Sequence, residues 1–271
     1  TWGANFSAEQ AADFLKSCYE ENLKIFDTAD IYGDYTTESL LGEALHKSGI
    51  NRHEVKIITK CGICLPGNTY QAKGYNTTKK HILNSVDNSL KQLKTNYIDM
   101  LLIHRPDPLM DFEEVEIAFT ELKLSGKVKT FGVSNFSTYA FNLMNRRLPM
   151  ETNQIQFSLT SPDALFNDLL IQARHYNKKT QIWSPLGDFF LKKNERNDRI
   201  NTVLSKLTEK YNASPSQLLL AWILKVPSKI TPILGSTKIE RIREQKKSFA
   251  IKLTTDDWYL MLEASRNKEV D

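Results

Sequence analysis

The sequence lacks the features that mark membrane-spanning and nucleic-acid-binding proteins. No apolar run approaches the roughly 18 residues that a transmembrane helix needs. Lys and Arg number 36 against 32 Asp and Glu, which leaves a net charge of +4 without long blocks of like charge. This balance does not indicate a nucleic acid or an anionic membrane as partner. The first residues also lack the charged and apolar regions of a signal peptide, so we expect a soluble, cytoplasmic protein.

Residues for disulfides, metal sites and Rossmann-type nucleotide binding are also scarce. The three cysteines cannot all pair, and Cys18 falls within an amphipathic helical pattern, which disfavours a disulfide framework. The histidines show no metal-ligand spacing, so no metal site is predicted. No G-x-G-x-x-G occurs either, so the sequence does not predict a Rossmann-type binding site for a dinucleotide pyrophosphate.

Short apolar runs alternate with amphipathic helical patterns along the whole chain. The runs predict seven strands, at 25–28, 55–60, 98–104, 128–133, 152–157, 180–184 and 230–234. Helices are predicted at 7–19, 37–47, 78–94, 111–125, 138–146, 163–177, 199–211, 216–225, 239–247 and 255–266. Each run is nearly continuous in Val, Ile, Leu and Phe, as expected for parallel strands buried on both faces.

This alternation is typical of a (β/α)8 barrel or of a doubly wound sheet. Candidate polar residues end several different strands, which favours the barrel, whose sites gather at the carboxyl ends of its strands. We therefore predict one α/β barrel domain over residues 1–271, with two extra helices. Because seven strands would leave an open edge, residues 1–3 are expected to be the tail of a first strand that is largely missing from the sequence.

Four chemically different side chains occupy the ends of predicted strands or the loop just beyond. Asp27 ends the first run and Tyr32 follows five residues later, Lys60 ends the next run, and His104 ends the third. Taken singly, each has an ordinary interpretation as a cap, a packing residue, a solvated lysine or a core histidine. Together at one barrel mouth, an acid, a phenol, an ammonium and an imidazole are sufficient for proton transfer. We therefore expect an enzyme.

The residues around these four resemble those of the aldo-keto reductases, NADPH-dependent (β/α)8-barrel enzymes, and most closely their short-loop bacterial members. The resemblance runs from residue 1 to the final helix. It is carried, in family order, by FDTADIYG at 26–33, ITK at 58–60, LIHRP at 102–106, GVSNF at 132–136, NQIQ at 153–156 and IWSPLG at 182–187.

The resemblance implies a catalytic tetrad of Asp27, Tyr32, Lys60 and His104 that reduces aldehydes or ketones to alcohols. Tyr32 would donate a proton to the oxyanion that forms as hydride reaches carbon. Lys60 would ease release of that proton, and Asp27 would keep Lys60 charged and in place. His104 would orient the carbonyl, together with Tyr32 and Trp2 in the substrate site.

The resemblance also implies an NADP(H) site that differs from the Rossmann type. Ser134, Asn135 and Gln156 would bind the nicotinamide carboxamide and Trp183 would stack on the ring, where the family often has Tyr. Further cofactor-binding residues implied are Thr1, Trp2, Asp27, Ser184, Pro185, Leu186, Gly187, Gly235, Ser236, Lys238, Arg241 and Gln245. Lys238 and Arg241, at a helix start, favour NADP over NAD through its 2'-phosphate. Asp188 departs from the family's common glycine run after Gly187.

Three alternatives remain open. The barrel also serves as a regulatory partner of a potassium channel, so the chain could bind NADP(H) as a sensor with negligible turnover. Cys61 and Cys64 form a C-x-x-C, which suits redox chemistry at a helix start, but Leu65 and Pro66 open a loop. A metal-dependent hydrolase or aldolase is disfavoured by the lack of clustered ligands, although Lys60 could form a Schiff base. A small-molecule carbonyl compound is the expected partner, and a monomer is the family-based default.

Overall fold

The computed structural model describes residues 6–67 and 70–270. The chain divides into two compact units, residues 1–153 and 154–271, and each is described by itself. The predicted strand tail at residues 1–3 lies outside the described residues. That the whole chain forms one domain remains a prediction.

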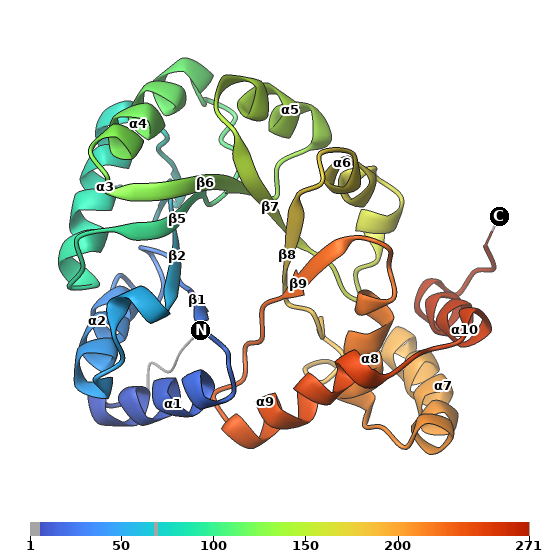
Figure 1. The fold of residues 1–271 in the computed structure, drawn as a ribbon. Helices are drawn as coiled ribbons and strands as arrows, with labels where there is room; N and C mark the ends of the chain where they lie inside the picture. Colours follow the sequence, from blue (N-terminus) through green and yellow to red (C-terminus); the bar gives the residue numbers. More distant parts are fainter. Residues whose placement is uncertain (1–5, 68–69, 271) are drawn as a thin grey trace. The chain divides into compact units, whose positions relative to one another are not determined.

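Unit 1 is a parallel sheet with helices between its strands. Figure 1 shows α2, α3 and α4 along one face of the strands β2, β5 and β6. The strands follow the order β1-β2-β5-β6-β7, and the registers of β1 with β2, β2 with β5 and β5 with β6 are parallel. The elements of this unit are α1 (Ala8–Glu20), β1 (Ile25–Asp27), α2 (Thr37–Ser48), β2 (Lys56–Cys61), β3 (Ile63–Cys64), β4 (Gly74–Tyr75), α3 (Lys79–Gln92), β5 (Ile98–Ile103), α4 (Phe112–Leu124), β6 (Val128–Ser134), α5 (Thr138–Arg147) and the start of β7 (Met150–Gln156).

Unit 2 continues the pattern from the end of β7. Strands β7, β8 and β9 pair in parallel, and Trp222 is fully buried in the apolar core of this unit. The elements of unit 2 are α6 (Leu169–His175), β8 (Lys179–Trp183), α7 (Glu195–Tyr211), α8 (Pro215–Leu224), β9 (Lys229–Pro232), α9 (Ile239–Lys246) and α10 (Thr255–Arg266).

Local sequence signals explain several helix boundaries. Ser7 begins α1 with a capping box that pairs its side chain with Gln10, and Ser214 does the same for α8 with Gln217, followed by a proline in the first turn. Gly49 ends α2 in the left-handed conformation at φ 69°. All seven predicted strands are present at their predicted places, with ends that differ by up to two residues.

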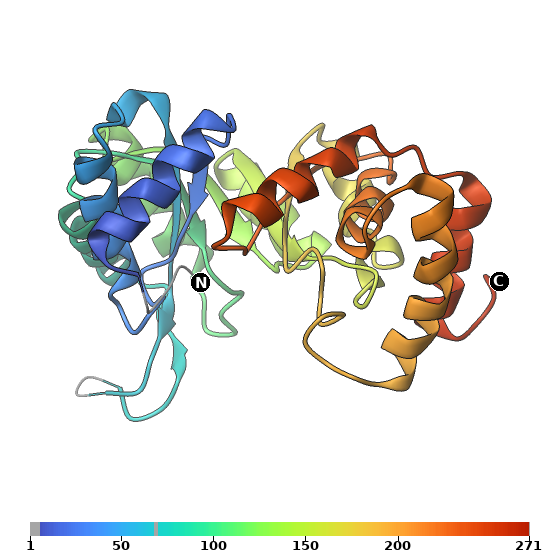
Figure 2. The ribbon, with the colours of Figure 1, turned by 90° about the horizontal axis from the view of Figure 1, so that it is seen from below.

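Two predicted segments differ from the structure. The helix predicted over 163–177 is instead a short 3-10 turn, Asp163–Leu165, and a separate α6, because Asp168 adopts φ 64° between them and interrupts the helical hydrogen bonds. The polar stretch after β2 was predicted as a loop, but it contains the antiparallel β3–β4 hairpin, which Figure 2 shows extending away from the end of β2.

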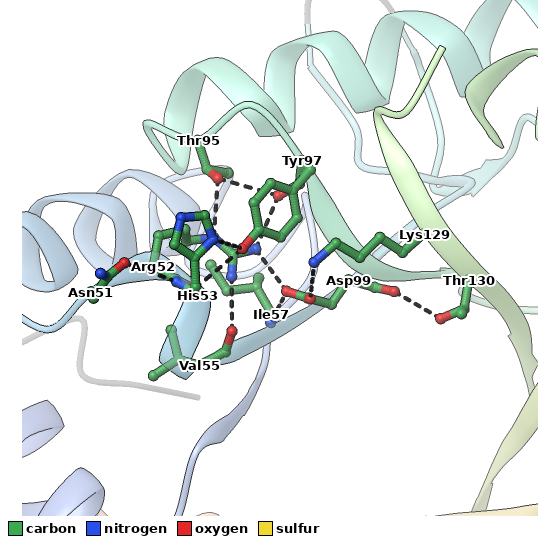
Figure 3. Close-up of polar contacts among 10 residues, drawn as sticks. All are labelled: Asn51, Arg52, His53, Val55, Ile57, Thr95, Tyr97, Asp99, Lys129 and Thr130. Carbon is green, nitrogen blue, oxygen red and sulfur yellow. Dashed lines mark hydrogen bonds and ion pairs between the residues drawn. The ribbon is translucent and has the colours of Figure 1, made fainter. Parts of the chain in front are cut away.

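A polar cluster ties together the amino ends of β2, β5 and β6 (Figure 3). Arg52 donates from Nη2 to Asp99 Oδ2 at 2.7 Å, and the Ile57 N–H donates to the same oxygen at 3.0 Å. Lys129 Nζ lies 3.2 Å from Asp99 Oδ1 and 3.7 Å from the ring centroid of Tyr97. Active sites of parallel barrels lie at the opposite, carboxyl ends of the strands, so we assign this cluster to stability.

Candidate active site

A buried ion pair joins the first two strands of unit 1. Lys60 Nζ lies 2.5 Å from Asp27 Oδ1 and donates to the Thr28 carbonyl at 2.7 Å. The Lys60 side chain is 1% exposed and that of Asp27 11%. Because side chains alternate across a strand, Thr59 points the other way and donates to Glu38 Oε1 of α2 at 2.6 Å. The pleat of β2 thus directs Lys60, and not Thr59, toward Asp27.

Tyr32 and His104 lie next to this pair. The Lys60 Nζ atom is 5.0 Å from the Tyr32 ring centroid. The rings of Tyr32 and His104 meet edge to face, with centroids 5.6 Å apart and an interplanar angle of 73°. The four residues predicted to be catalytic are therefore neighbours within unit 1.

His104 is held in its neutral form. Burial lowers its pKa to about 2, helped by the charges of Lys60, Arg105 and Lys73. The ring is 3% exposed, and Nδ1 has no hydrogen-bond partner among the described residues. A neutral imidazole can still donate one hydrogen bond to a carbonyl oxygen, so the low pKa is compatible with the expected orienting role.

The sequence did not indicate two buried carboxyls near Lys60, those of Asp30 and Glu38. Burial, with the negative charge of Glu38, raises the pKa of Asp30 to about 8, although the Ile31 N–H and Lys60 act in the opposite direction. Burial likewise raises the pKa of Glu38. Asp30 falls inside the motif at 26–33, but a Thr-Ala-Asp sequence gives no sign of burial, and Glu38 occupies the first turn of α2, where an acid is ordinarily exposed.

The ends of β5 and β6 form a polar corner that includes two predicted cofactor residues. Arg105 Nη1 donates to the His104 carbonyl at 2.7 Å and to Ser134 Oγ at 3.1 Å. Asn135 adopts φ 56° and donates from its side chain to the same Ser134 Oγ at 3.1 Å. From β7, Asn153 exchanges two hydrogen bonds with the Phe136 backbone, which fixes the turn that carries Ser134 and Asn135.

The C-x-x-C lies in strand and hairpin rather than at a helix start. Cys61 ends β2 and Cys64 belongs to β3, and both thiols are buried and free. Burial, together with nearby carboxylates, raises the pKa of Cys61 well above the ordinary value, and burial also raises that of Cys64. Since the thiolate is the reactive form, this environment does not favour redox chemistry.

The predicted nicotinamide-stacking residue lies in unit 2. Trp183 ends β8, paired in register with Gln156 of β7, and it is half-buried. The turn after it contains Ser184 at φ 48° and Gly187 at φ 55°. A Cβ at Gly187 would lie 1.9 Å from Thr160 Oγ1, so only glycine fits there. Between them, Pro185 is buried and Leu186 is half-buried.

The predicted phosphate residues of unit 2 surround the start of α9. Gly235 is exposed, and Ser236 Oγ accepts from the Lys238 N–H at 3.1 Å. Lys238 is the N-cap residue, and both it and Arg241 are exposed. Gln245, one turn further, is 7% exposed. Thr1 and Trp2, also predicted to bind the cofactor, lie outside the described residues.

Residues 6–67 and 70–270 contain neither a candidate metal site nor a candidate transmembrane helix. No group of three or more His, Cys, Asp or Glu side chains there could hold a metal ion. No helix in those ranges is long and apolar enough to cross a membrane.

Comparison with known proteins gives a consistent picture. The model of a family described as "Aldo/keto reductase family" matches residues 1–266. An "Uncharacterized oxidoreductase YcsN" of Bacillus subtilis is 38% identical over 98% of this chain and 91% of its own length. A "Putative voltage-gated potassium channel subunit beta" of Schizosaccharomyces pombe is 32% identical over 93% of this chain and 83% of its own.

A solved structure is similar over nearly the same extent. The thermostable aldo-keto reductase Tm1743, crystallised with the inhibitor epalrestat, has 25% sequence identity and a TM-score of 0.81, over 95% of this chain and 88% of that one. This likeness confirms the predicted α/β barrel class.

Proposed function

Because this chain belongs to the aldo/keto reductase family, we propose that it is an NADPH-dependent reductase of aldehydes or ketones in which Tyr32 is the general acid. Membership of the family identifies an oxidoreductase, and the finer assignment is ours. The observation that carries it is the buried Lys60–Asp27 pair beside Tyr32 and a neutral His104.

The four side chains divide the proton transfer among them. An ammonium has three N–H donors, and in Lys60 two are used by Asp27 Oδ1 and the Thr28 carbonyl. The third serves the phenol of Tyr32, stabilising the phenolate that remains after Tyr32 gives its proton to the carbonyl oxygen. His104 donates a second hydrogen bond to that oxygen and so fixes the carbonyl in place. Burial excludes water behind Lys60, which strengthens these interactions.

The residues present fit a nicotinamide dinucleotide. When bound, NADPH supplies the hydride. Ser134 and Asn135 would hold the carboxamide in unit 1, on the turn fixed by Asn153. In unit 2 the predicted cofactor-binding residues include Trp183 and Gln156, and the turn around Gly187, where a side chain cannot be accommodated, would let an anionic group approach the backbone. Lys238 and Arg241 carry the charges that suit the 2'-phosphate of NADP.

A single hydroxyl deletion tests this function. Tyr32→Phe should reduce turnover of a test aldehyde by a factor of at least about 100, while NADPH binding, followed by quenching of protein fluorescence, stays near the wild-type value. Tyr35→Phe is the matched control, because its hydroxyl bonds only to the Leu65 N–H at 3.1 Å among the described residues, and it should retain turnover. Unchanged turnover in Tyr32→Phe would refute the assignment.

A second candidate function is favoured by one comparison. The relative named as a putative potassium channel β subunit supports a chain that binds NADP(H) and senses its redox state with negligible turnover. A steady-state assay over a panel of aldehydes, with NADPH binding measured in parallel, separates the two. Tight binding without reduction of any aldehyde would favour the sensor.

A further inference from the structure

A buried acid ties the helix that follows Tyr32 to the strand that carries Lys60. Glu38, in the first turn of α2, is 2% exposed, and its Oε1 accepts a hydrogen bond from Thr59 Oγ1 at 2.6 Å. Thr59 is fully buried and immediately precedes Lys60 on β2. A hydrogen bond from Ser89 of α3 also reaches the Glu38 carboxyl. Glu38 thus joins α2, α3 and the end of β2 that presents the ammonium.

The segment that carries Tyr32 is held by backbone bonds on both sides. Before it, the Asp30 N–H donates to the Lys60 carbonyl at 3.0 Å, which keeps the loop paired with the end of β2. After it, the Tyr32 carbonyl accepts from the Thr37 N–H at 3.1 Å. This N–H is one of the donors that a helix leaves unpaired at its start, since Thr37 begins α2. A movement of α2 relative to β2 would therefore move Tyr32 relative to Lys60.

These contacts form a closed circuit around the reacting groups. The circuit runs from Lys60 through the loop to Tyr32, and it returns from α2 to β2 through Glu38 and Thr59. Of the three hydrogen bonds that close it, the one from Thr59 to Glu38 is the only one between side chains. The circuit surrounds the place where Lys60 Nζ lies 5.0 Å from the Tyr32 ring centroid. A displacement of about 1 Å between reacting groups can lower a rate by about 100-fold, so the side-chain bond is relevant to turnover.

We propose that Glu38 is a positioning residue for the reduction, and that its bond to Thr59 holds the phenol of Tyr32 at the distance from Lys60 that proton transfer needs. This inference rests on the reductase function proposed above. Glu38 itself transfers no proton. Its contribution is the geometry of a hydrogen bond, so a side chain that accepts the same bond without a negative charge should replace it.

Removing the bond from either end tests the proposal. Glu38→Ala removes the acceptor, and Thr59→Val removes the donor with little change in side-chain volume. Each should lower kcat for a test aldehyde by about 10- to 100-fold, while KM and the Kd for NADPH stay within about 3-fold of the wild-type values. Single turnovers with saturating NADPH measure the chemical step, so that product release does not mask the loss. The double variant should lose no more than either single one, because both remove the same bond.

Conservative variants separate position from charge and from stability. Glu38→Gln keeps an oxygen that accepts from Thr59, and its amide can donate to the Ser89 hydroxyl. Thr59→Ser keeps the hydroxyl, and both variants should retain kcat within about 3-fold. Val86→Ala removes two methyl groups from a fully buried position of α3 outside the circuit. It should lower the Tm by several degrees and leave kcat unchanged at a temperature at which circular dichroism shows every variant to be folded.

Each outcome decides between the claims. Wild-type kcat in both Glu38→Ala and Thr59→Val would overturn the positioning role and leave the reductase function intact. A kcat for Glu38→Gln as low as that of Glu38→Ala would also overturn it, because the charge and not the bond would then be decisive, and so would an equal loss in Val86→Ala. If Glu38→Ala does not fold, Thr59→Val decides. Reduction of no aldehyde by the wild type would refute the reductase function and the positioning role with it.

Discussion

Replacing Asp27 by Asn tests whether the Lys60 ammonium depends on its buried partner. The substitution keeps the size of the side chain but removes the charge 2.5 Å from Lys60 Nζ. The Lys60 side chain is 1% exposed, so water cannot replace the lost carboxylate. Removing one partner of a buried ion pair costs about 3–5 kcal/mol, and the remaining bond to the Thr28 carbonyl favours the lower end. For a chain of this size we expect the Tm to fall by roughly 6–20 °C.

The double variant and a neighbouring control sharpen the measurement. Asp27→Asn with Lys60→Met removes both charges, and it should recover most of the lost stability because an apolar replacement of a buried pair is often neutral. Asp30→Asn is the same chemical change three residues away, at a carboxyl whose pKa burial raises to about 8. At pH 7 the folded chain keeps a proton there that the unfolded chain has lost, so this substitution should not destabilise the fold and is expected to stabilise it. Urea and thermal unfolding at pH 7 measure all three. Equal losses in Asp27→Asn and Asp30→Asn would refute the reasoning.

Three further predictions concern pH and packing. Burial lowers the pKa of His104 to about 2, so below about pH 6.5 the unfolded chain binds a proton at this residue that the folded chain does not. The free energy of unfolding therefore decreases as the pH decreases. Between pH 6.5 and 5, the free energy of unfolding of His104→Gln should therefore decrease by about 2 kcal/mol less than that of the wild type. Urea unfolding measures this difference, and an equal decrease in both proteins would contradict the prediction. Burial acts to raise the pKa of Asp99, but hydrogen bonds from the Ile57 N–H and Arg52 outweigh it, so the pKa is lowered overall. The stabilisation that the Asp99 carboxylate contributes is therefore present above about pH 4 and is lost as the pH falls through the pKa of the folded state. Asp99→Asn should cost about 2–4 kcal/mol at pH 7 and much less near pH 3. Trp222 and Trp258 stack at 5.0 Å and exchange indole N–H bonds with each other's carbonyls; Trp222→Phe loses one such bond and should cost about 1–3 kcal/mol, and unchanged stability would argue against the packing described.

The strands were predictable because a strand that is buried on both faces is formed mostly by apolar residues, and such runs are visible in the sequence. Ile98–Ile103 is apolar at every position except Asp99, and all of Lys56–Cys61 except Lys56 is buried. The residue that ends or follows such a strand is directed to the carboxyl edge of the sheet. The same logic predicted Lys60 and His104 as site residues. The hairpin was missed because β3 and β4 are two residues each, too short for any periodicity to develop.

Interactions between distant segments explain the other omissions. Glu38 appears in sequence as an ordinary acid in the first turn of a helix, and only the packing of α2 on β2 buries it against Thr59. Lys73 lies among polar residues, and its electrostatic effect on His104 depends on where the hairpin folds. No glycine or proline occurs at the helix break at Asp168, so the sequence does not indicate this break. In each case the deciding contact is tertiary, so a single sequence gives no local sign of it.

The carboxyls around the Lys60 ammonium differ in their electrostatic environment. Asp30, Glu38 and Asp27 lie near one buried ammonium, and three carboxylates around a single cation in a low dielectric would repel one another. Burial raises the pKa of Asp30 to about 8 and also raises that of Glu38, which lessens this repulsion, while Asp27 pairs with Lys60. Asp27 is thus the carboxylate that pairs with the ammonium, and the Lys60 Nζ atom lies beside the ring of Tyr32. The burial that raises the pKa of Asp30 therefore favours a single ion pair at Lys60, which holds the ammonium in place for the proposed proton transfer from Tyr32.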